Sequence, residues 1–64
     1  MKIQFSTSNA AFHDDYADEI VNKMNKEREV VRILYTIINA IQLDDADHGP
    51  IMDINGNKIG SWEL

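Results

Sequence analysis

Two acidic clusters contain the only histidines of the chain. The first runs from His13 to Glu19 and the second from Asp44 to His48. Carboxylate and imidazole groups bind Mg²⁺, Mn²⁺ and Zn²⁺, and such an ion would suit a metal-dependent phosphoesterase. A continuous helix between the clusters would hold them about 40 Å apart. A helix cap and a solvated loop explain them more simply, so we expect no metal ion and no other cofactor.

Other catalytic arrangements are weaker still. The run Asp53-Ile54-Asn55-Gly56-Asn57 resembles the opening of a calcium loop, but its glycine stands at the fourth position instead of the sixth, and Leu64 occupies the twelfth, where a glutamate is needed. The chain has no cysteine nucleophile, neither histidine lies in a Ser/His/Asp context, and the glycines are scattered. We therefore expect a protein that is not an enzyme.

Length and charge narrow the class of protein further. A chain of 64 residues forms one domain, residues 1–64, with a thin core. Eleven acidic residues against six basic ones argue against direct nucleic-acid binding. Residues 33–64 include one basic and five acidic side chains, which gives this half a charge of −4. Residues 1–32 include five basic and six acidic side chains, which gives a charge of −1. No apolar run has the length of a membrane span or signal peptide, so we expect a cytoplasmic protein.

Strand patterns occur at both ends of the chain. Alternation around Ile3 and Phe5 predicts a strand at about 2–6, and residues 51–64 read as a β-hairpin that turns at Asn55-Gly56. Two registers compete: a two-residue loop with Asp53 opposite Lys58, or a type I turn over 53–56 with a G1 bulge. We favour the second slightly, because Asp53 can then bond to its own turn. A further bulge is expected at Gly60, and Trp62 is expected in the core.

A long helix is predicted at about 15–43, because this stretch has neither Gly nor Pro and has acidic residues in its first turns. The order β-α-β-β then predicts an α+β fold in which one long helix packs on one face of a three-stranded sheet.

The helix is apolar on two sides. One side has spacings that alternate between four and three, as in a coiled-coil heptad, and consists of Ile20, Met24, Glu27, Val31, Leu34, Ile38 and Ile41. We expect this side to face the sheet, with Leu34 in the core. The wider apolar arc in the second half of the helix is expected to be an interaction surface, made of Val30, Ile33, Ile37, Ile41 and Tyr35.

The predicted helix is also longer than its sheet, at about 42 Å against about 20 Å for a strand. Four outcomes fit the excess: the core wraps further round the helix, the helix breaks near Asn22–Glu27, its first turns project into solvent, or a second chain covers it. The last outcome makes a homodimer or a complex with another protein the expected state.

Several segments resemble a family of very short, uncharacterised proteins from phages and prophages of Gram-positive bacteria. These segments are 1–5, 9–12, 29–34 and 51–64. The resemblance implies a bacterial host and a small accessory protein, and it carries no catalytic residues. Our leading hypothesis is therefore a non-enzymatic interaction module that binds a host or phage protein, for example as an inhibitor of a host defence or DNA enzyme. The alternative is an acidic nucleic-acid mimic that occupies a basic groove with Asp44, Asp45 and Asp47.

Overall fold

The computed structural model describes residues 1–8 and 11–64. Strand β1 (Lys2–Phe5) is followed by helix α1 (Glu19–Leu43), strand β2 (His48–Met52) and strand β3 (Lys58–Glu63). The β-α-β-β order is as predicted. Asn9 and Ala10, which belong to the segments that resemble the phage family, lie outside the described residues.

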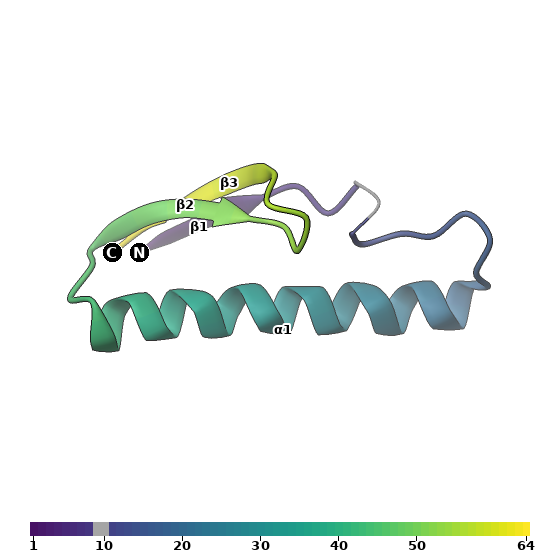
Figure 1. The fold of residues 1–64 in the computed structure, drawn as a ribbon, viewed down its shortest axis with the longest axis horizontal. Coiled ribbons are helices and arrows are strands. Elements are labelled where there is room, and N and C mark those ends of the chain that lie inside the picture. Colours follow the sequence, from purple (N-terminus) through teal and green to yellow (C-terminus); the bar gives the residue numbers. More distant parts are fainter. Residues whose placement is uncertain (9–10) are drawn as a thin grey trace.

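The three strands form one antiparallel sheet in the order β1-β3-β2, and α1 lies along one face of it (Figure 1). This arrangement confirms the predicted α+β class. Strand β2 begins at His48, three residues before the predicted start, because His48 still pairs with Glu63. Pro50 is compatible with β2, because this strand lies at the edge of the sheet, where proline is tolerated.

The hairpin turn follows the favoured register. The Gly56 amide donates to the Asp53 carbonyl at 3.0 Å, and Gly56 has a φ of +85°. Oδ1 of Asp53 accepts from the amides of Asn55 and Asn57 at 2.9 and 2.8 Å. Asp53 is therefore a buried carboxylate whose hydrogen bonds hold its own turn, as a type I turn with a following bulge requires.

A second irregularity lies next to Gly60. Ile51 pairs with Gly60 and Met52 pairs with Lys58, so Ile59 is the extra residue of a bulge, beside the predicted position. A Cβ on Gly60 would stand 2.0 Å from the carbonyl oxygen of Gln4. Gly60 is therefore needed for the close approach of β1 to β3.

The core lies between the sheet and the second half of α1. Trp62 is buried in it, as predicted, together with Ile51 of β2 and Phe12 from the segment that precedes the helix. Phe12 also stacks near Phe5, with ring centroids 6.4 Å apart. The segment between β1 and α1 thus contributes a core residue of its own.

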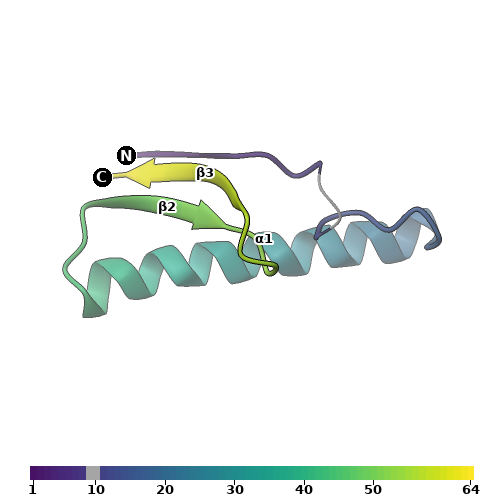
Figure 2. The same cartoon turned by 45° about the horizontal axis from the view of Figure 1, so that its top comes forward.

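Helix α1 is continuous over 25 residues, so no break occurs near Asn22–Glu27. Its start is four residues later than predicted, because Asp18 caps it and accepts from the Val21 amide at 2.8 Å. The sheet lies over the second half of the helix, and the segment before α1 runs beside its first half (Figures 1 and 2). Asn22 holds that segment through hydrogen bonds with the backbone of Asp14 at 2.8 and 3.0 Å.

The prediction of which helix side faces the sheet is wrong. Ile33 and Ile37 are 2% and 4% exposed, and Val30 and Ile41 are half-buried against the same core. Within the chain, these four residues form the sheet-facing side and not a free interaction surface. Only Tyr35 of the predicted set is exposed.

Candidate protein-interaction surface

The heptad side of α1 is the side left uncovered. We call its exposed apolar residues the α1 stripe; they are 39–72% exposed and consist of Ile20, Met24, Val31, Leu34 and Ile38. Tyr35 lies at the outer edge of the stripe and is also exposed. Side chains four and three apart on a helix lie on one face, so the α1 stripe runs along one side of α1, with a single interruption at Glu27.

The position of β2 determines which side is covered. Arg32 donates to the Met52 carbonyl at 2.8 Å and so attaches this flank of α1 to β2. A small crevice of about 70 Å³ between α1 and β2 is lined on the helix by Arg32, Ile33, Thr36 and Ile37. At 100° per residue, the stripe lies on the opposite flank, towards β1 and away from β2. The sheet therefore leaves the stripe open.

An ion pair between the buried Glu29 and the half-buried Arg32 reinforces this attachment. Glu29 is only 6% exposed, and both of its oxygens accept from Nε of Arg32, at 3.0 and 3.1 Å. The hydrogen bonds that Arg32 donates to Glu29 are the main cause that raises the pKa of Arg32 above its ordinary value, while partial burial opposes it. A charged pair that also donates to the backbone of β2 fixes the rotation of α1 against the sheet.

Glu27 occupies the one heptad position between Ile20 and Ile38 that is not apolar. Its carboxylate lies 3.9 Å from the ammonium group of Lys23, and both side chains are exposed. This pair spans one helical turn, so it neutralises part of the charge at this level of the stripe without covering the apolar residues on either side.

The predicted acidic patch is exposed at the end of α1. Asp44 is the C-cap, and Asp45 has a φ of +53°, which lets the Ala46 amide reach the Ala40 carbonyl at 3.1 Å. Asp47 pairs with His48 at 2.6 Å, and the hydrogen bond from this histidine lowers the pKa of the Asp47 carboxyl. The acidic residues thus form a helix-ending turn with the charged groups in solvent.

The first acidic cluster stands at the other end of α1. His13 lies 3.2 Å from Asp15, whereas Asp14 accepts from the Tyr16 amide and Asp18 caps the helix. Helix α1 separates this cluster from the second one. Across residues 1–8 and 11–64, no group of three or more histidines and acidic residues is arranged to hold a metal ion.

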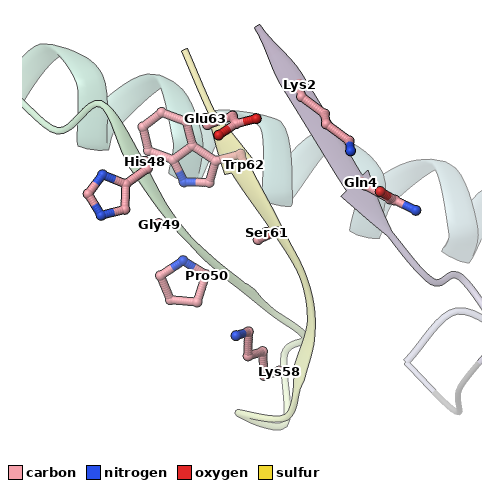
Figure 3. A pocket seen from close by; sticks show the side chains of 9 residues that line it. All are labelled: Lys2, Gln4, His48, Gly49, Pro50, Lys58, Ser61, Trp62 and Glu63. Carbon is pink, nitrogen blue, oxygen red and sulfur yellow. The ribbon is translucent and has the colours of Figure 1, made fainter.

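The outer face of the sheet has an open hollow of about 560 Å³ (Figure 3). It crosses all three strands, and Glu63 of β3 is in register with both Lys2 and His48. The residues that line it are Lys2, Gln4, His48, Gly49, Pro50, Lys58, Ser61, Trp62 and Glu63. Small-molecule sites are enclosed and mostly apolar, so this polar surface is a weaker candidate than the α1 stripe.

Comparison with protein-family models, with curated proteins and with solved structures found no match. No helix in the described part of the chain is long and apolar enough to cross a membrane.

The heptad spacing identified the members of the α1 stripe correctly but assigned them to the core. The pairing of the buried Glu29 with Arg32 was not part of the prediction from the sequence, although a carboxylate and a guanidinium three residues apart are a known helix pair. The spacing of the two residues in the sequence could have predicted the pair. The burial of Glu29 could not be predicted in this way, because it depends on where β2 lies.

Proposed function

We propose that the protein is a small non-enzymatic interaction module that acts by binding a protein chain through the α1 stripe. The observation that supports this proposal is the exposed apolar side of α1, which is interrupted only at Glu27. Monomeric proteins seldom expose a large contiguous apolar patch, and such patches are typical of interaction sites. A helix whose solvent-exposed apolar residues follow a heptad spacing is suited to packing against a second helix.

The resemblance to short phage and prophage proteins supports a setting for this module. In that setting the protein is an accessory factor in the cytoplasm of a bacterial host, where it binds a host or phage protein. Inhibition of a host defence or DNA enzyme is one function of this class.

A capture experiment with matched variants tests the proposed function. The tagged protein, the double variant Val31→Lys/Leu34→Lys and the control Leu43→Lys are exposed to a bacterial lysate. Leu43 is also exposed and apolar, but it lies outside the stripe. The stripe variant should lose the proteins that both the native chain and the control retain. If all three retain the same proteins, the stripe has no role in binding them.

A nucleic-acid mimic is the second candidate, because Asp44, Asp45 and Asp47 expose their carboxylates within four positions. Such a mimic would bind a basic groove, and its affinity would fall steeply between about 50 and 200 mM salt. Replacing the three aspartates by asparagine should abolish binding to the basic groove. An unchanged affinity of this variant would exclude the nucleic-acid mimic.

A further inference from the structure

We propose that the α1 stripe binds a second copy of this chain and that the two α1 helices pack antiparallel. This inference rests on the proposed function and names the partner of the same surface. Three observations support it: the surface area of the single chain, the spacing of the exposed residues and the position of Glu27.

The single chain exposes more surface than its mass predicts. Its accessible surface is 4866 Å², whereas a compact monomer of 7.3 kDa exposes about 4,200 Å². The excess of about 670 Å² is close to the roughly 800 Å² that each chain buries in a standard protein interface. The chain measures 40 × 19 × 17 Å, and its long axis is that of α1 (Figure 1). The helix is therefore the element along which a second chain can bury this area.

The spacing of the stripe suits a second helix of the same kind. Exposed apolar residues occur at 20, 24, 31, 34 and 38, with Glu27 between them at the remaining heptad position. Alternating steps of four and three let the side chains of one helix enter the gaps of another. An isologous pair needs only one such surface, because each copy presents the same residues to the other.

Glu27 favours the antiparallel orientation. In a parallel pair in register, the two Glu27 carboxylates would face each other within an apolar seam. The repulsion between these like charges disfavours the parallel orientation. An antiparallel pair that overlaps the stripe from Ile20 to Ile38 has its two-fold axis at the level of residue 29. Residues whose numbers add to 58 then lie opposite each other, so Glu27 faces Val31. Arg28 of the second copy lies within one helical turn of Glu27 and can compensate its charge.

The position of the stripe leaves room for this packing. The stripe lies about 100° round the helix from the buried Ile37, so a second helix docks beside α1 instead of under the sheet. The segment before α1 is held on the Asn22 side by its bonds to Asp14, away from the stripe. Ile20 and Met24 consequently stay accessible in the first half of the helix.

Net charge gives the proposed dimer a distinctive response to salt. Each copy carries a formal charge of −5, so a dimer gathers twice that charge while its contact is apolar. Added salt screens the repulsion between the copies and leaves the apolar contact intact. Dimerisation should therefore strengthen as salt rises, which is opposite to the response of a complex held by charge pairing.

Sedimentation velocity of the full chain from micromolar to about 1 mM concentration tests the proposal. The native protein and Leu43→Lys should form dimers, and Val31→Lys/Leu34→Lys should raise the dissociation constant by about tenfold or more. Circular dichroism checks that the variants keep their helix. A native chain that stays monomeric at every concentration and salt would overturn the inference. If the native chain stays monomeric but the stripe variant no longer captures the lysate proteins, the proposed function holds with a different partner. If the stripe variant still captures them, both the dimer and the proposed function are excluded.

Discussion

Ile33 and Leu34 are neighbours in the chain but lie on different sides of α1: Ile33 is 2% exposed in the core, whereas Leu34 is 39% exposed in the α1 stripe. Ile33→Ala should therefore lower the free energy of unfolding by about 2–5 kcal/mol through the cavity that it leaves. Leu34→Ala should cost clearly less in the monomer and act on self-association. Denaturant unfolding at low protein concentration measures both. Equal losses in the two variants would contradict the burial assignment.

The Asp53 carboxylate should stabilise the hairpin. Asp53→Ala removes the buried acceptor of the Asn55 and Asn57 amides, and we expect a loss of about 1–3 kcal/mol in the free energy of unfolding. Asp53→Asn is the control, because its side-chain oxygen can still accept both amide hydrogen bonds at Oδ1. The alanine variant should be the less stable of the two in denaturant unfolding. An unchanged stability for Asp53→Ala would mean that the turn forms without this carboxylate.

Gly60→Ala should displace β1 from the sheet. The added Cβ would lie 2.0 Å from the Gln4 carbonyl oxygen and 2.6 Å from Cα of Phe5, and backbone atoms cannot move away without breaking the pairing. Hydrogen exchange of the β1 amides should accelerate strongly in this variant. Gly56→Ala serves as a comparison, because Gly56 has a backbone φ that disfavours alanine, but a Cβ added there would meet no atom within 4 Å. This variant should leave the β1 amides protected. Slow exchange in Gly60→Ala would show that β1 tolerates the side chain.

The positive φ of Asp45 predicts a stabilising substitution. Glycine adopts this backbone without the steric cost that other residues pay, so Asp45→Gly should raise the free energy of unfolding by about 1 kcal/mol. Asp44→Gly, at a residue with a φ of −104°, should not stabilise the chain. Thermal unfolding of both variants at one pH and salt distinguishes them. Stabilisation of similar size in both would point to lost acidic charge as its cause.

The contact with His48 should be visible in the titration of the Asp47 carboxyl. The hydrogen bond from His48 lowers the pKa of the Asp47 carboxyl below its ordinary value. Its stabilisation is therefore present above the unfolded-state pKa of about 3.9 and is lost as the pH falls through the lower folded-state pKa. His48→Ala should bring the pKa of Asp47 back up, as followed by NMR titration of the side-chain carbonyl. No movement of this pKa would contradict the contact.

The fold was predictable because its local signals agree. The hairpin turn, the uninterrupted helix and the alternation of β1 each specify one element, and Asp53 favoured the correct register. The predicted helix start differs from the observed one because several aspartates compete as caps, and only the hydrogen bond that Asp18 accepts from the Val21 amide identifies the one used. Periodicity showed which helix residues share a side but not which side meets the sheet, since both sides are apolar. The side that meets the sheet is fixed by Arg32, which pairs with Glu29 and also donates to the carbonyl of Met52, a residue far away along the chain.

Site-specific disulfide formation tests the antiparallel stripe most directly, because the chain has no cysteine of its own. Met24→Cys and Leu34→Cys chains, distinguished by a tag, are mixed and oxidised, with Leu43→Cys as the background control. In the proposed pair residue 24 faces residue 34, whereas the two copies of residue 24 are about 15 Å apart along the axis. We predict that 24–34 links exceed both 24–24 and 34–34 links. Links no more frequent than those of Leu43→Cys, or a majority of 24–24 links, would contradict the antiparallel dimer.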